Sequence, residues 1–317
     1  MPDVLYEAGD GVAVITLNRP ERMNALTGTL LREVAACVRR ANEDPDVKLI
    51  LLRGSGASFC AGYDLKASAE AKEVRGAEAP GQGTEEGMRV RRYEREAWAM
   101  LAGADGFPYD PVIDYQQMWR FTQDMMEVWR SLKPVIARVQ GSCVGGGSDL
   151  ALCCDVIIME ETSTIGYPPA RVWGCPTTGM WVYRLGADQA KRMLLTGDVV
   201  DGKEAKAIGL VTAVAPAGEL DAAVDKLIRR MLTIPTNQLI MQKAMINQAV
   251  ENMGLHSTQM IATLLDGAAR HTPEGYAFKK RCEEVGFRQA VRERDVPETF
   301  AKDGPVWLRP PTARPKL

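Results

Sequence analysis

The sequence predicts an α/β fold built from ββα units and followed by a helical region. Short apolar runs with β-branched residues alternate with segments of helical periodicity. Two of these runs lead directly into glycine-rich turns that open a helix. Toward the C-terminus, apolar residues recur at helical spacing. We therefore expect a strand-and-helix domain over residues 1–200 and a helical region with an extended tail over residues 201–317.

The N-terminal part of the chain predicts one complete ββα unit. Val4–Tyr6, a Gly-Asp-Gly turn and Val12–Leu17 have the pattern of a β-hairpin. Thr27 has a side chain preferred at a helix N-cap, and the helix is expected over about 28–43. Leu49–Leu52 then predicts a buried strand, because it is a short continuous apolar run.

The most informative stretch is the turn Gly145-Gly146-Gly147-Ser148-Asp149, which follows an apolar run at 134–139. Glycines allow close approach of a substrate to the backbone, and the first N–H groups of a helix are free to bind an oxygen that becomes negative. The small-residue loop at 54–65 forms a similar strand-to-helix connection. The two turns could supply one amide each to an oxyanion hole, although each could also be only a tight connection.

Composition excludes several classes of function. The chain has 317 residues and 39 Lys+Arg against 41 Asp+Glu, so its net charge of −2 gives no basic field for nucleic acid or an anionic membrane. We find neither a signal-peptide pattern nor an apolar run of the ~18 residues that a membrane span needs, so we expect a cytoplasmic protein. The seven cysteines are dispersed, and only two histidines are present without metal-ligand spacing. We therefore expect buried thiols rather than disulfides, and no metal site.

Five segments, in order, resemble the crotonase (enoyl-CoA hydratase/isomerase) superfamily. They are LNRPERMNAL at 17–26, SFCAGYDL at 58–65, KPVIARVQGSCVGGGSDLALCCDVII at 133–158, GADQAKRMLLTGDVVDGKEAKAIGLV at 186–211 and HTPEGYAFKKR at 271–281. The resemblance implies a crotonase-like spiral of ββα repeats with a C-terminal helical trimerisation region. It also implies acyl-CoA thioester substrates from fatty acid metabolism, no tightly bound cofactor, and a homotrimer or dimer of trimers.

The resemblance assigns roles to particular residues of this chain. It places the two oxyanion amides on Tyr63 and Gly146, and a catalytic carboxylate at Asp149. For Tyr63 the backbone amide rather than the ring would act. The residues implied to lie along coenzyme A are Met23, Ala25, Ala61, Asp64, Leu65 and Lys280.

The chain departs from the family pattern at the second catalytic carboxylate. Hydratases of the superfamily use a pair of glutamates, one after the glycine turn and one in a downstream loop. Here the first is the shorter Asp149, and the second position falls on Pro169, which is neither acid nor base. Arg171 is the charged side chain of that loop, and it would bind an anionic acyl group or pair locally. Asp149 would likewise be catalytic or only stabilise the first helical turn.

A long insertion over about 67–130 separates the second family segment, at 58–65, from the third, at 133–158. The insertion would border the acyl pocket, which makes four of its residues possible contributors, although each is expected to be structural: Tyr109, Asp110, Asp114 and Tyr115.

The leading hypothesis is an acyl-CoA lyase of enoyl-CoA hydratase type. The alternatives are another crotonase-type reaction (isomerisation, C–C hydrolysis or decarboxylation) and a non-catalytic CoA-binding scaffold.

Overall fold

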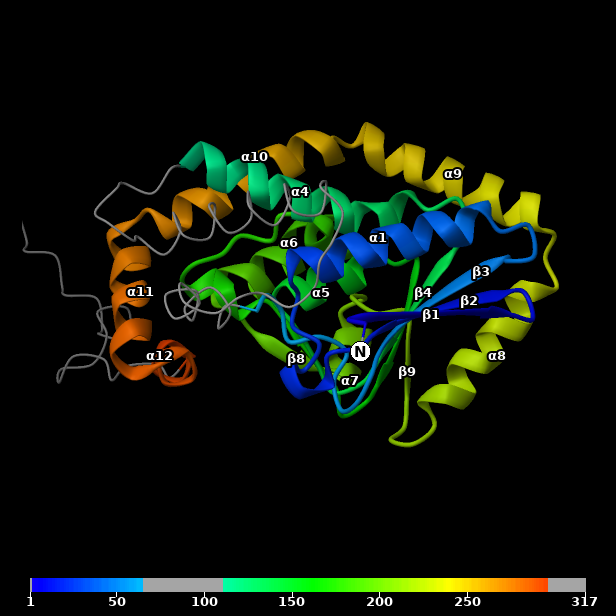
Figure 1. Ribbon diagram of the computed structural model, residues 1–317, viewed down its shortest axis with the longest axis horizontal. Helices are drawn as coiled ribbons and strands as arrows, with labels where there is room; N and C mark the ends of the chain where they lie inside the picture. The colour runs from blue at the N-terminus through cyan, green and yellow to red at the C-terminus, as the bar shows by residue number, and fades with distance from the viewer. Residues whose placement is uncertain (1, 65–110, 296–317) are drawn as a thin grey trace, which may run out of the picture.

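The computed structural model describes residues 2–64 and 111–295, which form two sheets surrounded by helices (Figure 1). The larger sheet has the order β1-β2-β3-β4-β6-β9, and its first pair is antiparallel while the others are parallel. Its strands are Val4–Gly9, Val12–Leu17, Leu49–Gly54, Val135–Val139, Val156–Glu160 and Ala213–Ala215. The smaller sheet has the order β5-β7-β8, with strands Ser142–Val144, Thr164–Gly166 and Val199–Asp201.

From β4 to β7, consecutive strands alternate between the two sheets. β4 belongs to the larger sheet and β5 to the smaller one, and β6 and β7 repeat this alternation. The chain then passes through β8 in the smaller sheet and returns to the larger sheet at β9. This winding agrees with the expected spiral of strand-and-helix units and confirms the α/β class.

The helices of the described residues are α1 (Gly28–Glu43), α4 (Pro111–Arg130), α5 (Gly146–Leu152), α6 (Met180–Thr196), α7 (Gly202–Ala207), α8 (Leu220–Leu232), α9 (Thr236–Asn252), α10 (Leu255–Arg270), α11 (Pro273–Val285) and α12 (Phe287–Asp295), with 3₁₀ turns η1 (Pro20–Arg22) and η3 (Pro168–Arg171). The first helix, α1, has the bounds that its periodicity and cap predict. The Thr27 hydroxyl accepts a hydrogen bond from the Leu30 N–H at 3.1 Å, which confirms it as an N-cap.

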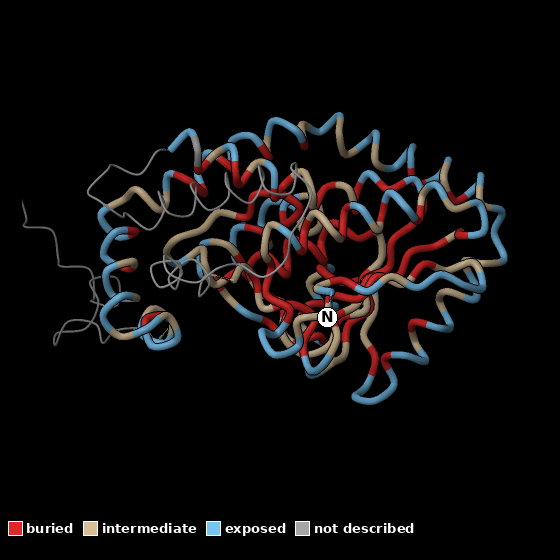
Figure 2. The backbone as a smooth tube through the Cα atoms, viewed as in Figure 1, coloured by how far each residue is buried: buried red, intermediate tan, exposed pale blue. Residues whose placement is uncertain are grey.

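Both faces of the larger sheet are buried, as expected for a mostly parallel sheet. Successive side chains of β3 point to opposite faces, so that Ile50 and Leu52 enter the main core while Leu51 packs in a second cluster with Leu220 and Val224 of α8. Helix α1 packs on β1 and β2 in the main core. Figure 2 shows the buried residues concentrated along the strands and the inner faces of these helices.

Helices α9 and α10 extend across one side of the molecule above α4 and α1 (Figure 1). A buried ion pair attaches α9 to the rest of the structure: the Lys243 Nζ lies 2.7 Å from Asp155 Oδ2, and the two side chains are 6% and 19% exposed. The same carboxylate oxygen accepts a hydrogen bond from the Val135 N–H. A long run of apolar side chains on α9 and α10 is exposed in the single chain: Met241, Met245, Ile246, Met253, Met260, Ile261, Leu264 and Leu265.

All seven cysteines are free thiols, and four of them are buried. In the part of the chain that the structure describes, no helix is long and apolar enough to span a membrane.

Candidate active site

The glycine turn joins β5 to α5 and is held tightly in place. Gly145 has φ +57°, a conformation that favours glycine, and its N–H donates to the Gly166 carbonyl at 3.0 Å. The Ser148 hydroxyl donates to the carbonyls of Gly145 and Gly166 at 2.6 and 3.0 Å. A side chain at Gly147 would come within 2.4 Å of the Cys60 carbonyl oxygen, so the turn packs directly on a second backbone segment.

That second segment is the loop containing Tyr63. The Cys60 N–H donates to Ser142 O at 3.0 Å, and the Val144 N–H donates to Cys60 O at 3.1 Å, so the loop runs beside β5. Gly62 reaches the glycine turn: a Cβ on Gly62 would lie 3.4 Å from the Gly146 nitrogen. Within residues 2–64 and 111–295, neither the Tyr63 N–H nor the Gly146 N–H donates a hydrogen bond. The structure therefore brings together the two amides that the sequence singled out.

Substitution of Gly62 by alanine is expected to lower the free energy of unfolding by about 1–3 kcal/mol. Its φ is +93°, and the added Cβ would lie 2.9 Å from the Val144 carbonyl oxygen. Urea denaturation of the wild type and the variant measures the loss. Gly209→Ala is the matched control, since Gly209 has φ +84° but no heavy atom within 4 Å of its Cβ position. Equal losses in the two variants would contradict a tight contact between the two loops.

The ring of Tyr63 forms a wall beside the glycine turn. A Cβ on Gly146 would meet the ring at 2.8 Å, and the ring stacks on Phe121 of α4 with a centroid distance of 6.1 Å. The Tyr63 hydroxyl is buried, and burial is the main cause that raises its pKa well above the ordinary value; the nearby Asp149 carboxyl adds to this shift. The ring thus stays neutral and encloses the two amides.

Asp149 lies in the first turn of α5 and is fully buried. Neither carboxyl oxygen has a hydrogen-bond partner among the described residues. Burial raises the pKa of Asp149 well above the ordinary value, Asp266 raises it further, and the Trp181 and Thr178 side chains partly oppose the shift. Burial without a well-formed hydrogen bond therefore favours the neutral acid at Asp149 over the carboxylate.

Pro169 lies beside this turn, where the sequence places it. Its Cγ would be 3.5 Å from a Cβ on Gly145, and its Cβ would be 2.7 Å from one on Gly174. The ring thus occupies a position next to the two amides without supplying an acid or base. Arg171 follows in η3, and its Nη1 is 3.0 Å from Asp295 Oδ1 while its Nε donates to the Thr196 carbonyl at 3.1 Å. These contacts favour a role for Arg171 in pairing with nearby groups of the protein over the binding of an anionic acyl group.

One carboxylate near the site was not predicted from the sequence. Asp266 of α10 is 3% exposed; its Oδ1 accepts the Cys175 N–H at 2.9 Å, and its Oδ2 lies 2.8 Å from Arg270 Nη1. Arg270 also pairs with Asp114 of α4 at 2.8 Å, which gives Asp114 a structural contact. The signal that could have revealed this network is the i, i+4 spacing of Asp266 and Arg270 in one helix.

The predicted coenzyme A residues fall into three groups. Met23, Ala25, Ala61 and Asp64 lie together, because the Ala61 N–H donates to Met23 O at 3.0 Å and Arg19 links the Ala25 carbonyl to Asp64 Oδ2. Met23 is half exposed, with φ +49°. Lys280 is exposed on α11, a helix that packs against α10 and α12. Three predicted residues lie outside the described part of the chain, Leu65, Tyr109 and Asp110, whereas Tyr115 lies in α4 and stacks on Trp119.

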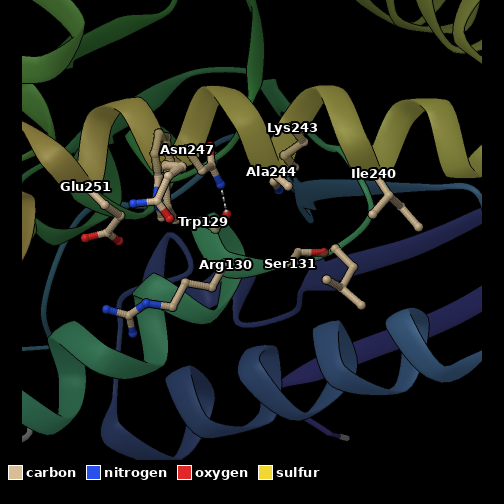
Figure 3. A pocket seen from close by; sticks show the side chains of 10 residues that line it. Trp129, Arg130, Ser131, Ile240, Lys243, Ala244, Asn247 and Glu251 are labelled. Carbon is tan, nitrogen blue, oxygen red and sulfur yellow. Dashed lines mark hydrogen bonds between the residues drawn. The ribbon is translucent and has the colours of Figure 1, made fainter.

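A separate cavity of about 240 Å³ lies between the end of α4 and α9 (Figure 3). Lys243 lines it, and the Asn247 side chain donates to the Trp129 carbonyl at 2.9 Å. None of the residues predicted for the active site lines this cavity. Residues 2–64 and 111–295 contain no cluster of His, Cys, Asp and Glu that could hold a metal ion.

Comparison with known proteins identifies relatives of one kind. A family model described as enoyl-CoA hydratase/isomerase matches residues 7–104 and 110–278. A crotonyl-CoA hydratase of Syntrophomonas wolfei is 31% identical over 253 residues, which cover 78% of this chain and 83% of that protein. The crystal structure of an enoyl-CoA hydratase from Mycobacterium smegmatis aligns with a TM-score of 0.80 and 42% identity, covering 93% of this chain and 94% of the other. An enoyl-CoA hydratase/isomerase from Xanthobacter autotrophicus aligns with a TM-score of 0.74 and 30% identity, covering 93% of this chain and 97% of that one.

Proposed function

Because the chain belongs to the enoyl-CoA hydratase/isomerase family, we propose that it adds water to the double bond of a trans-2-enoyl-CoA thioester. The observation that carries this proposal is the meeting of two unengaged backbone N–H groups, from Tyr63 and Gly146, beside the buried carboxyl of Asp149. Coenzyme A would enter as part of the substrate, and no further cofactor is needed for the reaction.

The two amides would stabilise the charge that forms on the thioester oxygen. When water adds to the β carbon, electrons move from the double bond to the thioester carbonyl and give an enolate. Two preorganised N–H donors in a water-poor site stabilise such an oxyanion more than they stabilise the ground-state carbonyl. Loss of one such donor typically costs about 10²–10³ in kcat.

Asp149 would handle the protons of the reaction. The neutral acid donates its proton to the α carbon of the enolate, and the carboxylate that results takes a proton from the attacking water. The water oxygen stays on the β carbon as a hydroxyl group, and Asp149 ends in the protonated form in which it began. One carboxyl group is sufficient for this cycle, so the absence of an acid at Pro169 does not exclude hydration.

Coenzyme A would run from the oxyanion amides toward Met23. The backbone at Met23 and Ala25 would lie near the nucleotide, and Ala61, Asp64 and Leu65 would lie along the arm. The side chain of Asp64 is paired with Arg19 at 2.8 Å, which supports a role for its backbone rather than its carboxylate. Lys280, exposed on α11, would reach a coenzyme A bound to a neighbouring subunit.

A homotrimer or a dimer of trimers would cover the apolar face of α9 and α10 described above. An exposed apolar patch of this kind marks a protein–protein interface more often than free surface. Met260, Ile261, Leu264 and Leu265 are each close to half exposed in the single chain and would form part of the contact.

The proposal is tested by turnover of short and medium trans-2-enoyl-CoA thioesters, followed at the absorbance of the conjugated double bond. Loss of that absorbance with formation of 3-hydroxyacyl-CoA is the expected result. Thermal unfolding with and without acetyl-CoA is measured in parallel, because a ligand that binds the folded state raises Tm. A Tm shift without turnover would favour a CoA-binding scaffold, and no shift at saturating ligand would contradict both readings.

Isomerisation of the double bond is a second candidate, and the place of Pro169 favours it. Moving a double bond needs proton transfer at carbon but no activated water, so one acid/base group beside an oxyanion hole suffices. Incubation of 3-enoyl-CoA with the protein distinguishes the reactions, since an isomerase forms the 2-enoyl product.

Substitution of Pro169 by glutamate is expected to raise the rate of hydration about tenfold or more, because it puts a second carboxylate beside the glycine turn. Pro169→Gln is the matched control, with nearly the same shape and no acid. Turnover of a trans-2-enoyl-CoA is compared for the two variants and the wild type. The prediction is wrong if the two variants are equally active while both remain folded and bind acetyl-CoA.

A further inference from the structure

Two buried carboxyl groups of the site, Asp149 and Asp266, have opposite surroundings. The Asp149 side chain is fully buried, and neither of its oxygens has a partner among the described residues. The Asp266 side chain is 4% exposed, but each of its oxygens is engaged, one by the Cys175 N–H and the other by the Arg270 guanidinium. Hydrogen bonds and an opposite charge stabilise a carboxylate, whereas an unpartnered buried carboxyl is stable as the acid.

Asp266 is connected to the glycine turn through the loop that contains Pro169. The backbone N–H of Cys175 binds Asp266, and the preceding residue, Gly174, packs against Pro169. Pro169 in turn packs against Gly145, four residues before Asp149. Asp266 is therefore anchored on the loop that packs against the glycine turn preceding Asp149, and both carboxyl groups are buried, so little solvent screens their interaction.

We propose that Asp266 is a positioning residue that keeps Asp149 in its protonated, proton-donating form. A fixed negative charge in a buried site disfavours a second negative charge nearby. Asp266 can serve as that fixed charge because Arg270 and the Cys175 N–H hold it as a carboxylate. The proposal rests on the proposed function for its catalytic meaning, but it makes a statement about Asp149 that can be measured without substrate.

The other titratable groups that interact with Asp149 come from five different segments and are uncharged at neutral pH. Burial raises the pKa of each of them: Tyr63 beyond β3, Cys143 in β5, Cys153 at the end of α5, Tyr167 before η3 and Cys175 before α6. Thr178 and Trp181 also face Asp149, and neither titrates. The pKa of Asp266 is also raised, mainly by burial and further by Asp114, while Arg270 and the Cys175 N–H oppose this shift and favour the carboxylate. Among the described groups, Asp266 is thus the charge that acts on Asp149.

The experiment is an infrared titration of the unliganded protein. A protonated carboxyl has a C=O stretching band that disappears on ionisation, and the band that is absent from Asp149→Asn is assigned to Asp149. In the wild type this band is expected to persist at neutral pH. In Asp266→Asn, which removes the charge, it is expected to disappear at a pH lower by about 1 unit or more, the size of a like-charge effect.

Asp114→Asn is the matched control. Asp114 is as buried as Asp266 and pairs with the same Arg270, so the substitution breaks the same ion-pair network at a similar cost in stability. Asp114 does not act on Asp149, and the Asp149 band should titrate as in the wild type. If Asp266→Asn does not fold, Asp266→Ser removes the same charge with a smaller side chain.

Two outcomes would overturn the proposal: an Asp149 band that titrates identically in the wild type and the charge-removing variant, or no such band in the wild type at neutral pH.

A second experiment measures the pH dependence of kcat/KM. Its basic limb is expected to shift to lower pH in Asp266→Asn by the same amount as the infrared band. A protein without turnover but with the infrared shift would contradict the proposed function and still support the link between Asp266 and Asp149.

Discussion

Substitution of Asp149 by asparagine is expected to lower kcat/KM for a trans-2-enoyl-CoA by a factor of about 10²–10⁴, the usual contribution of a positioned acid/base group. The amide keeps the size of the side chain but can neither give a proton to the enolate nor take one from water. The two N–H groups of Tyr63 and Gly146 remain, so affinity for acetyl-CoA should change little. Steady-state kinetics and calorimetric titration with acetyl-CoA measure the two quantities.

The same substitution should not destabilise the protein, because neither Asp149 oxygen makes a hydrogen bond among the described residues. The pKa of Asp149 is raised in the folded state, so its contribution to stability is fully present below its unfolded pKa of about 3.9 and is lost as the pH rises toward the folded value. Asp149→Asn should therefore be at least as stable as the wild type at pH 8. A large loss of stability would indicate a structural role instead.

Asp155→Asn is the control for this prediction. Asp155 follows the same helix and its side chain is only 19% exposed, but it pairs with Lys243 rather than facing the glycine turn. The substitution should lower stability and leave the kcat of the folded enzyme unchanged. A fall in kcat equal to that of Asp149→Asn would remove the special role of Asp149.

Substitution of Lys243 by methionine is expected to lower the free energy of unfolding by about 3–5 kcal/mol, the cost of leaving a buried charge without its partner. Methionine keeps most of the apolar stem, so the loss comes mainly from the ammonium group. That group lies 2.7 Å from Asp155 Oδ2 and also donates to the Lys133 carbonyl at 3.3 Å. Burial already raises the pKa of Asp155, and Lys243 is the main group that opposes this shift.

Chemical denaturation of the wild type and Lys243→Met measures the difference. Lys226→Met is a suitable comparison, since Lys226 is exposed on α8. It should change stability by no more than about 0.5 kcal/mol, as is usual for surface positions. Equal effects of the two substitutions would show that the Lys243–Asp155 pair does not stabilise the attachment of α9.

Local signals in the sequence predict much of this fold. The Thr27 cap and the following apolar periodicity identify α1 with the bounds that it has in the structure. The three-residue strands of the smaller sheet could not be predicted in this way. A run such as Ser142–Val144 is too short to show a period of two, and its pairing with Thr164–Gly166 depends on tertiary contacts.

The residues of the candidate site also differ in whether local sequence signals or tertiary contacts reveal them. Tyr63 and Gly146 lie in glycine-rich motifs whose spacing is visible in the sequence, and the structure brings these segments together. The role of Pro169 could be read by counting from Asp149, and the proline does lie beside the turn. Asp266 could not be found, because its importance depends on how α10 packs against the loop at Cys175. The spacing of apolar residues in the sequence identifies that segment only as a helix with an apolar face.

In the proposed homotrimer, helix α10 would carry a thermodynamic linkage between assembly and Asp149. Leu264 and Leu265 of this helix are about half exposed, while the next residue, Asp266, is buried and accepts the Cys175 N–H. Association of subunits through the outer face would hold α10, and with it the Asp266 charge, at a set distance from Asp149. Linkage is reciprocal, so whatever assembly does to the proton affinity of Asp149, ionisation of Asp149 must do to the assembly constant. Dilution and alkaline pH would then act on this protein through a single equilibrium.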